Sequence, residues 1–290
     1  MPAAWGALSG RKIVAASLSE SARSYPGGDL YPDITHPEAA TGPVRIQRPG
    51  LGAIAAALVE GANDWRACRT DVLVLVVLYP LAALCLTGVI IDRNLLPFVF
   101  PVCAGMALIG PLATIWFAAL SRQRELDGVA TADSAAAIFD SPRLSTIQRL
   151  AGLLIVLFAL WIAAAAYIYT ITLGSAPSGG SFVSNVLTTS AGHEMIITGV
   201  LVGAAFALLA LAIGLVGFPL ALDREMSLGM VISTSVRVAL ANPAVTLGWG
   251  CVVVAGLVLG AIPGLLGLAV AIPVLGHASW HLYRRLVTSA

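Results

Sequence analysis

The chain has 290 residues, of which 58% are hydrophobic and only 11% are charged, and its formal net charge is +1. Soluble domains carry about one quarter charged residues, and a chain of this length cannot hide so much apolar surface in an aqueous core. We therefore expect lipid to be the solvent for most of the chain. The near-zero net charge argues against a nucleic-acid partner.

The first 48 residues are polar and rich in Pro, Gly and Ser. This composition cannot bury enough apolar surface to offset the entropy of ordering, so it predicts a largely disordered cytoplasmic tail over residues 1–48. The remainder, residues 49–287, is expected to form one membrane domain.

Six apolar stretches in this domain have the length of about 20 residues that a helix needs to cross a bilayer. They predict an all-α membrane protein with six transmembrane helices arranged as three hairpins. The predicted spans are 71–91, 95–120, 149–173, 195–222, 244–262 and 265–283.

The distribution of basic residues predicts the orientation of these spans. All Lys and Arg residues except Arg93 fall in the tail and its approach to the first span, around the 121–148 and 223–243 loops, or at the C-terminal end. The 174–194 loop contains no basic residue. We therefore expect both termini to be cytoplasmic in a bacterial inner (cytoplasmic) membrane.

A cytoplasmic segment precedes the first span of each hairpin, and two of the three show apolar residues at helical spacing. In residues 51–65 the stripe includes Leu51 and Val59, with Glu60 and Asp64 on the opposite face. Residues 226–241 repeat the pattern, with Leu240 in the stripe and Thr234 on the opposite face, and residues 132–140 are a shorter, weaker copy. These patterns predict interfacial amphipathic helices, so the chain reads as three repeats of one interfacial helix plus one hairpin. Ser141–Pro142 and Asn242–Pro243 are expected to begin the following spans.

The segment HASWHLYRR (277–285) gathers aromatic, basic and histidine side chains at the cytoplasmic end of the sixth span. Histidines four residues apart share one helix face, but a metal site needs three or four ligands. Metal or haem binding by His277 and His281 is therefore the less favoured reading, and we expect a neutral histidine bonded across helices. The expected interface residues here are Gly276, His277, Trp280, His281, Tyr283, Arg284 and Arg285.

Asp223 and Arg224 stand at the cytoplasmic end of the fourth span. A carboxylate at this depth needs a partner or a capping role. Asp223 can cap the 224–241 helix, or it can pair with Arg284, Arg285 or His281, and the two roles are compatible. Arginines at such helix ends can also hold anionic lipid.

The stretches FPLALDREMSLGMVISTSVRVALANPAVTLGW (218–249) and LGLAVAIPVLGHASWHLYRRLV (266–287) strongly resemble a bacterial family of predicted integral membrane proteins, domain-of-unknown-function family 2189. ALVEGANDW (57–65) and LIGPLATIWFAALSRQRE (108–125) fit the same family, and the resemblance covers about residues 45–287. It implies a multi-pass inner-membrane protein and carries no agreed activity.

Three functions remain open from the sequence. The first is a non-enzymatic scaffold, assembly factor or accessory subunit of a membrane complex, with lipid and protein partners and no cofactor. The second is a small-solute permease or exporter. A carrier that is coupled to protons or ions usually needs a charged residue near mid-span. The third is a haem- or metal-binding redox accessory.

Overall fold

The computed structural model describes residues 44–68, 114–174, 182–263 and 265–289, together with residues 88, 97, 99 and 101–103. All of them belong to one compact unit, Pro43–Ala290. The predicted first span, apart from residue 88, and more than half of the second lie outside the described residues, as does the predicted tail up to residue 43.

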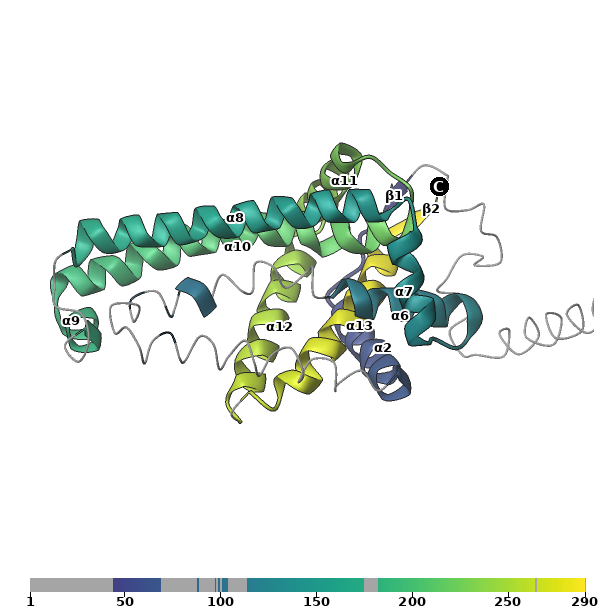
Figure 1. Cartoon of the computed structure of the whole chain (residues 1–290), viewed down its shortest axis with the longest axis horizontal. Helices are drawn as coiled ribbons and strands as arrows, with labels where there is room; N and C mark the ends of the chain where they lie inside the picture. Colours follow the sequence, from purple (N-terminus) through teal and green to yellow (C-terminus); the bar gives the residue numbers. More distant parts are fainter. Residues whose placement is uncertain are drawn as a thin grey trace, which may run out of the picture. The chain divides into compact units, whose positions relative to one another are not determined.

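Two long apolar helices, α8 (Leu144–Thr172) and α10 (Ser190–Asp223), run side by side in opposite directions (Figure 1). A short helix, α9 (Phe182–Thr188), precedes α10, and Thr189 caps α10 by accepting a hydrogen bond from the N–H of Gly192. The helices coincide with the predicted third and fourth spans. Between them they expose a row of large apolar side chains, as a lipid solvent requires: Ile155, Val156, Leu160, Tyr167, Ile171, Ile197, Val200, Leu201, Leu208 and Leu209.

Among the described residues, three helices are long and apolar enough to cross a membrane: α8, α10 and α12 (Pro243–Ala261). They match the predicted third, fourth and fifth spans. The predicted sixth span corresponds to α13 (Leu268–Leu286), which is not among the three. Its C-terminal half carries two histidines and two arginines and is covered by other helices. The six-span arrangement therefore remains a prediction.

Helix α13 is surrounded by α2 (Gly52–Cys68), α6 (Ile115–Asp127), α10 and α12. The approach of α2 is closest at Gly61, where an added Cβ would lie 2.6 Å from the backbone nitrogen of Ala278 and 2.7 Å from the carbonyl oxygen of Val274. A glycine at such a crossing lets two helix backbones touch.

The predicted faces of α2 are only partly correct. Ile54 of the apolar stripe is buried and Asn63 of the polar face is exposed, as the pattern predicts. Leu51 and Val59 of the stripe are exposed, however, and Asp64, expected on the polar face, is only 7% exposed. The reason is that α13 and α6 place cationic and hydroxyl side chains beside Asp64. Apolar periodicity alone does not reveal which polar residues will find partners.

Helix α11 (Leu228–Ala241) shows a similar shift of its predicted face. Leu240 of the predicted stripe is exposed, and Thr234 of the predicted polar face is buried. Ser235 is also buried, and its hydroxyl lies 2.8 and 2.9 Å from the carbonyl oxygens of Ala212 and Ile213 on α10. The third of the segments that are predicted to be cytoplasmic forms α7 (Ala132–Ala136) and the 3₁₀ helix η4 (Ala137–Asp140).

The expected helix starts are partly correct. Pro243 is the first residue of α12 as predicted, but the side chain of Asn242 makes no capping hydrogen bond. It donates instead to the carbonyl oxygen of Gln47 at 3.0 Å. Ser141 accepts a hydrogen bond from the N–H of Arg143, although α8 begins only at Leu144.

Strands β1 (Val44–Ile46) and β2 (Val287–Ser289) form an antiparallel pair, with Arg45 opposite Thr288. The side chain of Gln47 extends the contact by donating to the hydroxyl of Thr288 at 2.9 Å. Residues 44–48 therefore do not belong to a disordered tail, and the expected tail boundary at residue 48 is too far along the chain.

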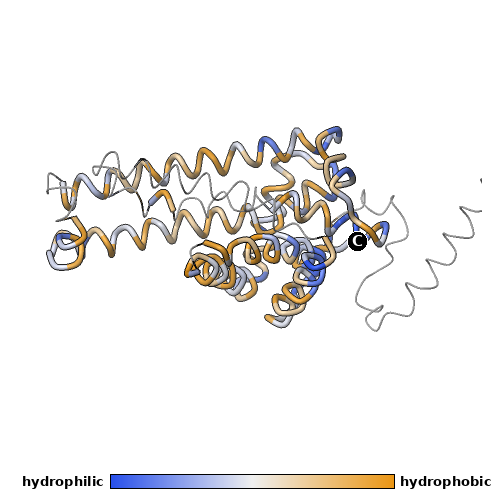
Figure 2. Tube along the Cα trace, turned by 60° about the horizontal axis from the view of Figure 1, so that its bottom comes forward, coloured by the Kyte–Doolittle hydropathy of each residue, from blue (hydrophilic) through white to orange (hydrophobic). Residues whose placement is uncertain are grey.

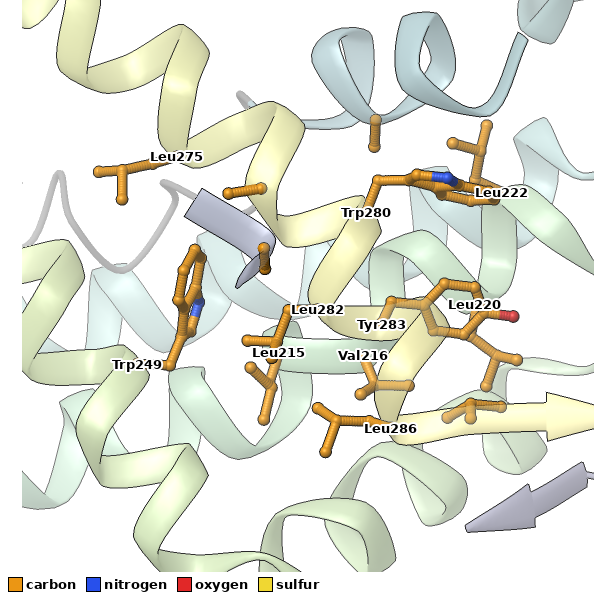
Figure 3. Close-up of a cluster of buried hydrophobic side chains, with 14 of the residues drawn as sticks. Leu215, Val216, Leu220, Leu222, Trp249, Leu275, Trp280, Leu282, Tyr283 and Leu286 are labelled. Atoms are coloured by element: carbon orange, nitrogen blue, oxygen red, sulfur yellow. The ribbon is translucent and has the colours of Figure 1, made fainter. Parts of the chain in front are cut away.

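The main core cluster lies around the C-terminal half of α13 (Figure 3). Trp280, Leu282, Tyr283 and Leu286 of α13 pack with Leu215, Val216, Leu220 and Leu222 of α10 and with Trp249 of α12. Hydrophilic residues gather at this end of the unit, whereas the long helices are apolar along most of their length (Figure 2).

Candidate functional site

The C-terminal half of α13 directs its polar side chains toward three neighbouring helices. The spacing of four residues places one set on the face toward α2, and intervening residues turn toward α6 and α10. His281 and Arg285 contact α2, Tyr283 contacts α10, and the set that contacts α6 consists of His277, Trp280 and Arg284.

Asp64 of α2 is the centre of the first set. Its Oδ2 accepts a hydrogen bond from Ser121 Oγ of α6 at 2.6 Å and lies 2.8 Å from Nε2 of His281. Its Oδ1 accepts from Arg124 at 2.7 Å. Burial raises the pKa of this carboxyl, but the hydrogen bond and charge of His281 and the bond from Ser121 outweigh it and hold the pKa below its ordinary 3.8.

One turn earlier on α2, Glu60 forms a forked pair with Arg285. Each carboxylate oxygen of Glu60 accepts a guanidinium N–H at 2.8 Å, the geometry that makes arginine–carboxylate pairs strong. Nδ1 of His281 lies 3.2 Å from Oε2 of Glu60. His281 therefore stands between two carboxylates, one at each ring nitrogen.

His277 is fully buried one turn deeper on α13. Its Nδ1 lies 2.8 Å from Oγ of Ser121. The carboxylate of Asp64 can only accept, so Ser121 donates its proton to Asp64 and accepts from His277. This direction places the imidazole proton on Nδ1, and Nε2 has no hydrogen-bond partner among the described residues.

Asp223 joins α10 to α13 and α6. Its Oδ2 accepts a hydrogen bond from the hydroxyl of Tyr283 at 2.8 Å, and its Oδ1 lies 3.4 Å from Nε of Arg122. The expectation that Asp223 caps the next helix is wrong, because Asp223 is the last residue of α10 and Ser227 caps α11 through the N–H of Met230.

The expectation of an inter-helix pair holds for Asp223, but its expected partners are wrong. Arg284, Arg285 and His281 are drawn instead to Glu125, Glu60 and Asp64. The indole N–H of Trp280 also donates to Glu125, at 2.7 Å. Arg224 is buried and donates to the hydroxyl of Ser289 at 2.8 Å. Gly276 lies against the ring of Phe117 on α6.

The sequence singles out the α13 side of this network and misses most of its partners: Glu60, Asp64, Ser121 and Glu125. One signal was present for two of them. Glu60 and Asp64 are four residues apart on a helix, the same spacing as His281 and Arg285, so the two pairs can match face to face. Ser121 and Glu125 give no comparable signal.

The described residues contain no group of three or more His, Cys, Asp or Glu side chains arranged to hold a metal ion. His277 and His281 turn to different partners, Ser121 and the two carboxylates of α2. The arrangement is that of cross-helix hydrogen bonds and ion pairs.

These helices, with their exposed apolar sides and a polar network at one end, define a helical membrane protein. Residues 99–223 match the model of a family described as "Predicted integral membrane protein (DUF2189)". The match confirms, over these residues, the resemblance seen in the sequence. No curated protein and no solved structure matches the chain.

Proposed function

We propose that this chain is a six-span protein of the bacterial inner membrane, with both termini cytoplasmic, that acts without catalysis as a scaffold, assembly factor or accessory subunit of a membrane complex. The proposal rests on the contacts that the side chains of residues 277–285 make with other helices. The histidine, tryptophan, tyrosine and arginine side chains of this segment all have partners on α2, α6 or α10, and Ser279 bonds the carbonyl oxygen of Gly276 within α13. A segment so engaged serves to hold helices together.

The ends of the helices support the proposed orientation. The C-terminal ends of α6, α10 and α13 meet through Arg122, Asp223 and Tyr283, and again through Glu125 and Arg284. These are the ends of the predicted second, fourth and sixth spans, so an even number of crossings separates them. The excess of basic residues in the adjoining loops favours the cytoplasmic side.

The apolar helices favour packing over transport. Within α8, α10 and α12, charged residues occur only near helix ends, at Arg149, Glu194 and Asp223. Ion-coupled carriers place such groups near mid-span. The exposed apolar faces of α8 and α10 are suited to lipid or to the helices of a partner protein.

Gentle extraction tests this function. The tagged full-length chain, solubilised in a mild detergent from its native host, is expected to migrate above monomer size with other inner-membrane proteins in fixed ratio, identified by mass spectrometry. A tagged unrelated multi-pass protein serves as the control for non-specific capture. A solitary monomer whose thermal stability responds to a small solute would overturn the proposal in favour of a permease, and a haem absorbance spectrum would favour a redox accessory.

A further inference from the structure

The three short cytoplasmic segments occupy matching places in the fold. Helix α7 follows α6 after residues 128–131 and packs against it, and α11 follows α10 after residues 224–227 and packs against it. Helix α2 packs against α13, although the two stand at opposite ends of the sequence. Each of the three helices α7, α11 and α2 thus has its own partner helix, which is α6, α10 and α13, respectively.

The partner helices α6, α10 and α13 share a short sequence pattern of leucine, a polar residue and arginine. The pattern is Leu120–Ser121–Arg122 within α6, Leu222–Asp223–Arg224 at the end of α10 and Leu282–Tyr283–Arg284 near the end of α13. The three leucines are buried in one core cluster, and α6, α10 and α13 contact one another pairwise. The middle residues are polar and face neighbouring helices, as the bond from Tyr283 to Asp223 shows. These three helices therefore form one packed group, to which the other helices dock.

The junction between α13 and α2 differs in its chemistry from the other two. A short covalent loop joins α6 to α7 and α10 to α11, whereas β2 follows α13 and β1 precedes α2. The β1–β2 pair occupies the place of the loop, with the Gln47 side chain held by Thr288 and the Gln47 carbonyl by Asn242. The ion pairs Glu60–Arg285 and Asp64–His281 lie at this same junction.

We infer that the β1–β2 pair and the ion pairs of α2 with α13 form a noncovalent latch, which holds α2 on α13 where no short loop joins the two helices. A covalent loop keeps a short helix near its long helix at high effective concentration. Without a short loop, the strands and the ion pairs of Glu60 and Asp64 add to the packing of α2 on α13 at Gly61. Loss of these contacts is consequently expected to loosen α2.

The test compares the latch with and without a covalent tie. Arg45→Cys and Thr288→Cys, at paired positions of β1 and β2, are introduced into the full chain after its four native cysteines are replaced by alanine. Hydrogen exchange of the α2 amides is then measured in mild detergent, oxidised and reduced. In the reduced chain, Glu60→Gln with Asp64→Asn is expected to speed exchange of α2 at least tenfold. In the oxidised chain the increase is expected to remain within threefold.

A matched control is Ser235→Ala, which removes a hydroxyl contact of α11 with α10 at a junction that already has a loop. The change that Ser235→Ala causes in the hydrogen exchange of the α11 amides is expected to be the same in the oxidised and the reduced chain. If the double variant does not fold, Glu60→Gln alone carries the comparison. Equal acceleration of α2 exchange in oxidised and reduced chains, or none in either, would overturn the latch.

Discussion

At the scale of single residues, the network shows a buried carboxylate held by several donors at once. Asp64 has partners on α6 and α13, so its charge is shared between helices that are remote in sequence. An unpaired buried carboxylate is costly, and removing one partner of such a pair leaves the other unsatisfied. Asp64 is therefore the residue through which pH is expected to act on stability.

Acid is expected to destabilise the protein through protonation of Asp64. The folded-state pKa of Asp64 is held below 3.8, so its contribution to stability is present above that value and is lost as pH falls through the lower folded-state pKa. Thermal unfolding in detergent is expected to show a midpoint that drops below pH about 4. Asp64→Asn is expected to be less stable at neutral pH, and its unfolding midpoint is expected to fall less steeply as the solution becomes acidic. Parallel curves for the two proteins would refute the assignment.

At the scale of elements, the sequence indicates the apolar helices well and their faces poorly. Long uninterrupted apolar runs predict α8, α10 and α12 because a lipid-facing helix needs no particular pattern. The faces of α2 and α11 are set by partners that the local sequence does not contain. Asp64 is buried because Ser121 and His281 reach it, and those residues are remote along the chain. Asp223 and Tyr283 are likewise far apart along the chain, which explains why the sequence did not predict that they pair.

The close approach of α2 to α13 gives a prediction at this scale. Gly61→Ala places a methyl group 2.6 Å from backbone atoms that have no rotamer with which to move away, so the helices must separate. We expect a loss of about 1–3 kcal/mol, typical of overpacking, measured as the free energy of unfolding in mixed micelles.

Gly152→Ala on α8 is the matched control for this change, because nothing lies within 4 Å of an added Cβ there. It is expected to be neutral or slightly stabilising, since alanine is the better helix former. Equal effects of the two substitutions would show that α2 does not touch α13 at Gly61.

At the scale of the whole molecule, the predicted orientation places the α6–α7 loop and the α9 region on opposite sides of the membrane. Val129 and Leu187 are both exposed reporters, one in each place. In a cysteine-free chain in spheroplasts, Leu187→Cys is expected to react with an impermeant maleimide directly, and Val129→Cys only after permeabilisation. The reverse labelling would place both termini outside.

We propose that the polar residues of the 277–285 segment hold helices together. A double-mutant cycle on Glu60 and Arg285 tests this role most directly, because this pair joins α2 to α13 and its substitution leaves the contacts of the buried Asp64 side chain in place. The free energy of unfolding in mixed micelles is measured for wild type, Glu60→Gln, Arg285→Gln and the double variant. We predict a favourable coupling of about 1 kcal/mol for this partly exposed pair. Additive effects within about 0.4 kcal/mol would contradict the account.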